Sequence, residues 1–295
     1  MMQWTAENLL KWSIGCLTKA GVEQPRPDSE LLVAETLGCA GRHAIYLEPD
    51  RPVSASELAE CRGAVERRAA REPVHYILGR REFWSLDFKV NPHVLIPRPE
   101  TEILVEHVLK RLSAGPRKPA PKILDLGVGA GNIAVAVARE IPDSHVAAVD
   151  VSENALAVAR QNAGTHQVAG QIRFLRGHLF ESVRTTNLAP FDCIVSNPPY
   201  IDTATLERLM PEVKDFEPRL ALDGGSNGLE VYENIIPQAG RFLNPRGWLI
   251  LEIECGQADA ILQLVEKTAD FEPPEVHPDY SGYPRVVAAR KKAHG

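Results

Sequence analysis

The first eighty residues carry apolar side chains at the spacing of helices. One helix is predicted near the start of the chain, where apolar residues recur at intervals of three and four: Leu9, Leu10, Ile14 and Leu17. Asp28 is the expected cap of a second helix over residues 28–37. Ser54 and Glu57 form a capping box that opens a third helix. Its charged end, Glu66–Glu72, mixes acids with bases, so we expect a solvated helix face there and not a nucleic-acid patch.

The pattern changes after Pro73. Residues Phe83–Val90 are rich in aromatic and branched side chains, which predicts a strand. Asn91 and Pro92 then predict a turn before Val94–Ile96, so the stretch is interpreted as a β-hairpin. Pro99 opens the next helix, because proline is favoured at the first helical position. We therefore expect a helical domain over residues 1–80 and a hairpin linker over residues 81–97.

From residue 122 onward, short apolar runs alternate with helical patterns. The predicted strands are Ile123–Gly127, His145–Asp150, Ile172–Leu175, Phe191–Ser196 and Trp248–Ile253. The helices predicted between most of them are Asn132–Glu140, Asn154–Ala163, Glu230–Phe242 and Ala258–Ala269. Buried parallel strands are continuous apolar runs, and crossover helices alternate with them. Residues 98–295 are thus predicted to form one α/β domain around a doubly wound open sheet.

Composition and charge narrow the possible functions. The 295 residues are 44% hydrophobic and 24% charged, as in globular proteins, with a formal net charge of −6. A negative balance argues against a protein that holds DNA mainly by neutralising phosphates. The five cysteines show no Cys-x-x-Cys spacing, so no metal site is predicted. The first residues lack the basic and apolar regions of a signal peptide, and the apolar runs are too short for a bilayer. We expect a cytoplasmic protein.

Glycines follow the first strand of the α/β part, where such sheets bind ligands. The run is Asp125-Leu-Gly127-Val-Gly129-Ala-Gly131, and the next strand ends in Asp150. Glycines let the backbone approach a ligand, and a carboxylate at the second strand end can accept both hydroxyls of a ribose. The spacing is one residue shorter than the dinucleotide fingerprint, and Asp125 is unfavourable beside a pyrophosphate. An adenosine cofactor with a cationic or amino group, such as S-adenosylmethionine, fits better.

The sharpest motif is Asn197-Pro198-Pro199-Tyr200, directly after a predicted strand. Consecutive prolines cannot continue a sheet ladder and force the preceding residue into an extended conformation. The Asn197 side-chain oxygen and a proline carbonyl can form a fork of acceptors for the two hydrogens of a planar NH2 group. Tyr200 offers an aromatic face on which a flat amide or base can stack.

With these motifs the sequence resembles the HemK/PrmC family, the protein-(glutamine-N5) methyltransferases of peptide chain release factors. The resemblance runs over nearly the whole chain. The Asn-Pro-Pro-Tyr element alone is shared with methyltransferases that act on amino groups of adenine or cytosine. The stretches most specific to the family are Glu82–Val90, Leu95–Glu102, Ile123–Gly131, Phe191–Ile201 and Glu217–Gly225.

The resemblance implies a class I, Rossmann-like, seven-stranded methyltransferase sheet with a small N-terminal helical domain that grips the release factor. S-adenosyl-L-methionine would be the cofactor and S-adenosyl-L-homocysteine its product. The implied cofactor contacts are Asp125, Gly127, Val128, Gly129, Ala130, Gly131, Asp150, His178, Leu179 and Asn197. The target glutamine would meet Asn197, Pro198, Pro199 and Tyr200. Arg98, Glu100 and Thr101 would lie close to the cofactor.

One position departs from the family pattern. Relatives often carry Gly-Asp where this chain has Gly177-His178, followed by Leu179 and Phe180. The aspartate would lie near the adenine, so an acidic partner for the exocyclic amine is missing. His178 can still meet the adenine by stacking or a hydrogen bond.

The resemblance implies a class I release factor as protein substrate, no direct DNA binding, no membrane and a monomer. Three alternatives remain at this point. An adenine-N6 methyltransferase would use the same fork but needs a basic cleft and usually a target-recognition domain. An oxidoreductase would bind NAD at the glycine loop. A non-catalytic module would bind ribosome-associated partners beside a vestigial cofactor site.

Overall fold

The computed structural model describes residues 4–113 and 120–293 and divides into two compact units. One unit runs up to Arg80 and includes Met210–Phe216, and the other comprises Arg81–Leu209 and the chain from Glu217 onward. This division differs from the predicted boundaries in two places. From Arg81 on, the hairpin groups with the larger unit, and Met210–Phe216 groups with the helical unit.

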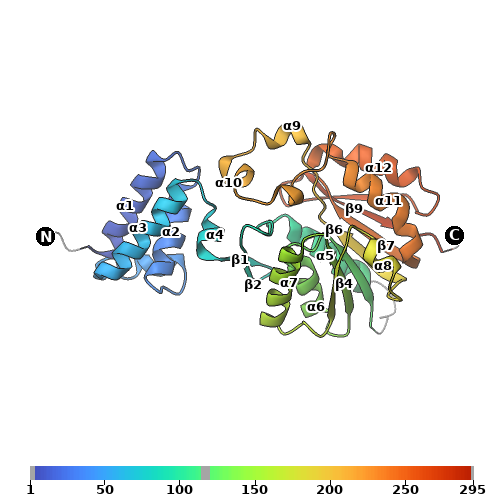
Figure 1. The fold of residues 1–295 in the computed structure, drawn as a ribbon, viewed down its shortest axis with the longest axis horizontal. Helices are drawn as coiled ribbons and strands as arrows, with labels where there is room; N and C mark the ends of the chain where they lie inside the picture. The colour runs from blue at the N-terminus through green and yellow to red at the C-terminus, as the bar shows by residue number, and fades with distance from the viewer. Residues whose placement is uncertain (1–3, 114–119, 294–295) are drawn as a thin grey trace. The chain divides into compact units, whose positions relative to one another are not determined.

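The smaller unit is helical. Its helices are α1 (Ala6–Lys19), α2 (Pro25–Thr36), α3 (Ala55–Ala69), α4 (Val74–Leu78) and the short α10 (Pro211–Lys214) (Figure 1). The predicted apolar stripe of α1 is buried at Leu9, Leu10 and Leu17, while Ile14 packs half-buried against the same core. The capping box at Ser54 and Glu57 is confirmed, with both of its hydrogen bonds present.

A buried arginine joins three parts of this unit. Arg68 on α3 is 5% exposed, and its Nε donates to Asp28 Oδ2 over 2.6 Å. Its Nη2 donates to Glu212 Oε1 on α10 over 2.8 Å. Two sequence predictions are therefore wrong. Helix α2 begins at Pro25, so Asp28 lies inside the helix as a buried ion-pair partner and is not its cap. Arg68 belongs to the charged run that was expected to be solvated, but its side chain is buried. A buried guanidinium needs such partners because an unpaired charge is costly in the interior.

The larger unit is built around a mostly parallel seven-stranded sheet in the order β5-β4-β3-β6-β7-β9-β8. Strands β3 (Lys122–Leu126), β4 (His145–Asp150), β5 (Ile172–Arg176), β6 (Phe191–Ser196) and β7 (Leu243–Glu252) are parallel and match the predicted apolar runs. Strands β8 (Glu275–Pro278) and β9 (Pro284–Arg290) were not predicted, and β9 is antiparallel to β7. The strand order reverses beside β3, whose neighbours are β4 and β6, so a ligand site is expected at their carboxyl ends.

Helices cover both faces of the sheet (Figure 1). One face packs against α5 (Thr101–Ser113), α6 (Asn132–Glu140) and α7 (Glu153–Thr165). The other face packs against α8 (Glu181–Arg184), α11 (Glu230–Phe242) and α12 (Ala258–Glu266). A short helix α9 (Thr203–Leu206) follows the Asn-Pro-Pro-Tyr loop. The predicted doubly wound architecture is confirmed, because each sheet face has its own apolar cluster.

The hairpin is present, but its turn lies elsewhere than predicted. Strands β1 (Arg80–Phe83) and β2 (Leu86–Lys89) meet at Trp84 and Ser85, which both have φ of 55°. Positive φ at both central residues is the geometry of a type I′ turn. The Trp84 backbone N–H donates to Glu102 Oε1 from α5 over 2.8 Å. The predicted turn at Asn91 and Pro92 is confirmed, with the Val94 N–H donating to the Asn91 carbonyl over 3.1 Å, but an irregular segment follows it and Val94–Ile96 is not a strand.

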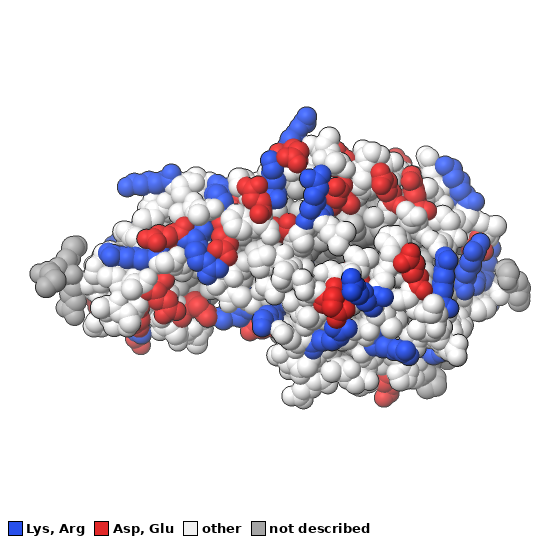
Figure 2. Space-filling view, viewed as in Figure 1, with Lys and Arg blue, Asp and Glu red and all other residues white. Residues whose placement is uncertain are grey.

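The face that Figure 2 shows has no continuous patch of positive or negative charge, because Lys and Arg are interspersed there with Asp and Glu. Nucleic-acid binding by phosphate contacts needs a continuous basic surface, and this face does not offer one. None of the helices in the described part of the chain is long and apolar enough to cross a membrane.

Candidate functional site

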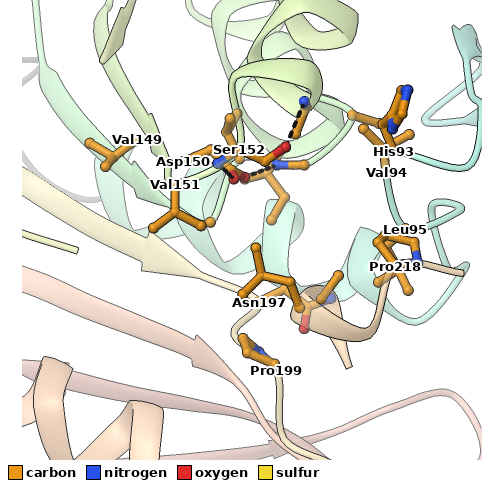
Figure 3. Close-up of a pocket in the computed structure, with 18 of the residues that line it drawn as sticks. His93, Val94, Leu95, Val149, Asp150, Val151, Ser152, Asn197, Pro199 and Pro218 are labelled. Atoms are coloured by element: carbon orange, nitrogen blue, oxygen red, sulfur yellow. Dashed lines mark hydrogen bonds between the residues drawn. The ribbon is translucent and has the colours of Figure 1, made fainter. Parts of the chain in front are cut away.

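A cavity of about 250 Å³ opens at the carboxyl ends of β3, β4 and β6. Figure 3 shows Asp150 on one side of it and Asn197 with Pro199 on another, with His93, Val94 and Leu95 facing Val149 and Val151 across the cavity. The predicted site residues that line the cavity are Arg98, Thr101, Gly127, Val128, Gly129, Ala130, Asp150, His178, Leu179, Asn197 and Pro199. Five others do not: Glu100, Asp125, Gly131, Pro198 and Tyr200.

Asp150 is held in place by the glycine loop. Its Oδ2 accepts a hydrogen bond from the Gly129 backbone N–H over 3.0 Å, and its Oδ1 accepts one from Ser152 N–H over 2.9 Å. Burial raises the pKa of the Asp150 carboxyl, and the N–H groups of Ser152 and Gly129 oppose that shift. Gly127 and Gly129 have φ of 78° and 52°, a conformation that glycine adopts without strain. Each carboxylate oxygen keeps a further lone pair for a ligand hydroxyl.

Two residues predicted to contact the cofactor serve the interior instead. Asp125 is fully buried in β3 and lies outside the cavity lining. Gly131 has φ of 84°, and a Cβ on it would lie 3.1 Å from the Cβ of Ala159. This third glycine therefore lets the start of α6 approach α7 closely. Sequence order placed both residues in the loop motif, but only packing shows which way each of them faces.

The buried Asp125 predicts a pH dependence of stability. Burial raises the pKa of its carboxyl from near 4 to about 7, against the opposing effect of the Ala134 N–H. Between about pH 4 and pH 7 the native state therefore holds a proton that the unfolded chain has released, and the unfolding free energy falls as pH rises. Asp125→Asn removes this titration. We expect its unfolding free energy, measured in urea, to gain about 2 kcal/mol over wild type between about pH 5.5 and pH 8. A difference that stays constant over this range would contradict the prediction.

The Asn197 amide is oriented by Thr101. Asn197 Nδ2 donates to Thr101 Oγ1 over 3.1 Å, and both residues line the cavity. Ser196, the residue before it, donates from its hydroxyl to the Leu126 carbonyl over 2.7 Å, which ties the ends of β6 and β3 together. Pro198, the next residue of the loop, is buried. The half-buried ring of Tyr200 packs against the core cluster on the α11 and α12 face, so its position does not support the predicted stacking role.

Residues 224–228 pack against the backbone of the Asn-Pro-Pro-Tyr loop and support it. This contact was not predicted from the sequence. A Cβ on Gly224 would lie 2.8 Å from Tyr200 Cα and 2.9 Å from the Pro199 carbonyl oxygen. Gln257 Nε2 donates to the carbonyls of Tyr200 and Gly228, over 2.9 and 3.1 Å. The sequence signal that could have indicated this support is the glycine pair at 224 and 225. Glycine is needed at 224 because the backbone of the Asn-Pro-Pro-Tyr loop, which is distant in sequence, lies so close to it.

Gly224→Ala tests this support. Gly224 is not among the residues with positive φ, so the added methyl group acts through its contact with the loop and not through backbone strain. Misplacing reacting groups by about 1 Å costs on the order of a hundredfold in rate. For the methyl transfer that the sequence resemblance implies, we expect kcat to fall about 10- to 100-fold, with cofactor affinity retained. Gly164→Ala in α7 is the matched control, because no atom lies within 4 Å of its added Cβ. Equal kcat in both variants would refute the supporting role.

The segment before α5 forms part of the cavity wall. His93, Val94, Leu95 and Pro97 line the cavity, although the sequence pattern indicated only a hairpin there. Arg98 Nη2 donates to the buried Glu217 Oε1 over 2.6 Å, and Glu217 also accepts from the Ile96 N–H over 3.2 Å. Glu217 thus ties this wall to the segment that contributes Pro218, Leu220 and Ala221. Glu100 is exposed and is not one of the residues that line the cavity.

His178 and Leu179 border the cavity on a tight turn after β5. Leu179 has φ of 47°, which is uncommon for a branched side chain and marks a constrained position. The His178 backbone N–H donates to Glu181 Oε2 over 3.3 Å. The imidazole is exposed. His178 therefore lies at the rim, where it can contact a ligand without being enclosed.

Comparison with known proteins places this fold and site in a class. The chain resembles the hMettl16 catalytic domain, with a TM-score of 0.56, 16% identity and coverage of 79% of this chain and 82% of that one. A structure of a human methyltransferase 10 domain containing protein gives a TM-score of 0.52 at 15% identity, covering 73% and 92%. Residues 99–212 match the family model "Methyltransferase small domain". The larger unit is thus a Rossmann-like methyltransferase.

The particular family follows from the relatives. Residues 8–79 match the model "PrmC N-terminal domain". A release factor glutamine methyltransferase from Geobacter sulfurreducens is 46% identical over 97% of both chains. A protein of the same name from Caulobacter vibrioides is 42% identical, covering 93% of this chain and 92% of its own. The chain belongs to the release factor glutamine methyltransferase family.

Proposed function

We propose that the chain transfers a methyl group from S-adenosylmethionine to the side-chain amide nitrogen, N5, of the glutamine in the Gly-Gly-Gln motif of class I peptide chain release factors. The observation that carries the proposal is the Asn197 amide, fixed by Thr101 in the same cavity as the tethered carboxylate of Asp150. The names of the relatives, which cover nearly the whole chain, support the same substrate.

The cavity residues fit S-adenosylmethionine. Asp150 would accept the ribose hydroxyls, and the glycine turn Gly127–Ala130 would lie along the methionine portion, where no Cβ at the glycines obstructs it. Leu179 and His178 would border the adenine. When bound, S-adenosylmethionine supplies an electrophilic methyl group on a sulfonium and leaves as S-adenosylhomocysteine.

Asn197 acts on the other reactant. An amide nitrogen is a weak nucleophile because its lone pair is delocalised into the carbonyl group. Asn197 Oδ1 and a proline carbonyl of the loop would accept its two N–H groups, which favours positive charge on the nitrogen during attack. The cavity walls would hold the two reactants in line. No strong base is needed, because the proton is acidic once the new N–C bond exists.

The proposed partner is a class I release factor, met by the protein as a monomer in the cytoplasm. DNA is not proposed as a substrate, since acids and bases are interspersed on the surface that Figure 2 shows. Residues 122–295 hold 16 basic and 23 acidic side chains. An acidic catalytic unit would be attracted to a basic surface on the release factor, and this attraction would weaken with salt.

The test is methyl transfer from labelled S-adenosylmethionine, with three parallel incubations: a class I release factor, DNA, and neither. Mass spectrometry then locates the labelled residue. Label on the glutamine of the Gly-Gly-Gln motif is the expected result. Label on DNA, or no label with folded protein and folded release factor, would refute the proposal.

A further inference from the structure

Behind Asn197 lies a polar side chain that the methyl-transfer chemistry does not use directly. Thr101, the first residue of α5, is 2% exposed, and its hydroxyl oxygen accepts the hydrogen bond from Asn197 Nδ2. A threonine hydroxyl carries one proton and two lone pairs. What its proton does therefore decides which end of the Asn197 amide it can hold.

The proton goes to a buried carboxylate. Glu252 ends β7, where the register pairs Leu251 with Ser196, so Glu252 lies beside Asn197 at the sheet edge. It is 1% exposed, and the Thr101 hydroxyl is the neighbouring group that lowers its pKa most against the effect of burial. Its Oε2 has no hydrogen-bond partner among the described residues. Burial raises the pKa of Glu252 to about 7, while the Thr101 hydroxyl and the Arg285 guanidinium oppose that shift.

This chain of hydrogen bonds has a fixed direction. An ionised carboxylate can only accept, so the Thr101 hydroxyl must donate to Glu252. The remaining lone pairs of Thr101 can only accept, so they select the NH2 end of the Asn197 amide. The oxygen end is then the one left for the cavity. Without Thr101 and Glu252, rotation of the amide by half a turn would exchange an acceptor for a donor at the same place.

We propose that Thr101 and Glu252 are positioning residues that set the polarity of the Asn197 amide, so that the site accepts hydrogens and discriminates a glutamine amide from a glutamate carboxylate. The inference rests on the proposed function of Asn197. A carboxylate has no N–H to donate and would face the Asn197 oxygen, acceptor against acceptor. A rotated amide would instead donate to that carboxylate.

The test uses the full chain at about pH 8, above the pKa of Glu252. The substrate is a class I release factor, and the competitor is the same factor with its Gly-Gly-Gln changed to Gly-Gly-Glu. Thr101→Val keeps the shape of the side chain and removes the hydroxyl. We expect kcat to fall about 10- to 100-fold with the cofactor dissociation constant unchanged. The ratio of competitor Ki to substrate KM should fall about tenfold or more, which a purely structural role would not cause.

Two further variants keep the inference testable if Thr101→Val folds poorly. Thr101→Ser restores the hydroxyl and should return both kcat and the Ki/KM ratio to within about threefold of wild type. Glu252→Gln can donate to Thr101 and should lower the ratio as Thr101→Val does. Thr165→Val, at an exposed threonine of α7, is the control. A Ki/KM ratio unchanged in both Thr101→Val and Glu252→Gln would overturn the inference, whereas a wild type that does not methylate the release factor would refute the proposed function instead.

Discussion

Asn197→Ala is expected to lower kcat for release factor methylation by about 100- to 1,000-fold, which is typical when one donor or acceptor of a charge-stabilising site is removed. The variant loses the Oδ1 acceptor at the cavity, so positive charge on the attacking nitrogen is no longer favoured. Cofactor affinity should stay within about threefold of wild type, because Asp150 and the glycine turn, which carry the proposed cofactor contacts, are unchanged. Single-turnover methyl transfer and calorimetric titration with S-adenosylhomocysteine measure the two effects separately.

Asn234→Ala is the matched control for that experiment. Asn234 lies exposed on α11, and its side chain donates to the Glu230 carbonyl within its own helix. The control should retain kcat. If Asn197→Ala transferred the methyl group as fast as Asn234→Ala, the assignment of the acceptor site would be wrong.

Asp150→Ala is expected to weaken cofactor binding by about 100-fold. Hydrogen bonds to a charged group contribute about 1.5–3 kcal/mol each, and the change removes the proposed acceptors of the ribose hydroxyls. It also leaves the N–H groups of Gly129 and Ser152 without their carboxylate. The dissociation constant of S-adenosylhomocysteine, from calorimetric titration, is the direct measurement. With saturating cofactor, kcat should recover to within about tenfold of wild type.

Asp143→Ala removes the same charge at an exposed position and serves as the control for Asp150→Ala. Its dissociation constant should equal that of wild type. Equal cofactor affinity in the two variants would remove Asp150 from the cofactor site. The Asn197 and Asp150 changes thus act on different quantities, one on the chemical step and the other on binding.

Much of the fold was predictable because its signals are local. The capping box at Ser54 and Glu57 satisfies neighbouring backbone groups, so four residues suffice to recognise it. Strand β4 and helix α6 have the predicted bounds, since a continuous apolar run and a helical period are properties of the segment itself. Strands β8 and β9 were missed, because β8 has no buried residue among its four and the apolar run of β9 is only four residues long between two arginines.

The part of the candidate site that lies at the ends of the strands was predictable from the sequence. Parallel strands meet at one edge, so Asp150 and Asn197 were expected together, and both line the cavity. The direction of individual side chains was not predictable. Asp125 and Gly131 belong to the glycine motif but face the interior, and Tyr200 packs against the core. Whether a side chain points into the cavity or into the core depends on packing neighbours that are distant in sequence.

Local patterns in the amino-acid sequence predicted the alternation of strands and helices and the ends of the strands that carry Asp150 and Asn197. The motifs also carried the family resemblance. Periodicity, turn residues and motif order are contained in short segments, and that is why they could be interpreted without a structure. The folded chain was needed to show that Arg68 is buried between Asp28 and Glu212, that Gly224 supports the Asn-Pro-Pro-Tyr loop, and that Thr101 fixes the Asn197 amide. Each of these depends on a contact across 24 to 144 residues, which exists only once burial removes water and leaves each polar group to find a protein partner.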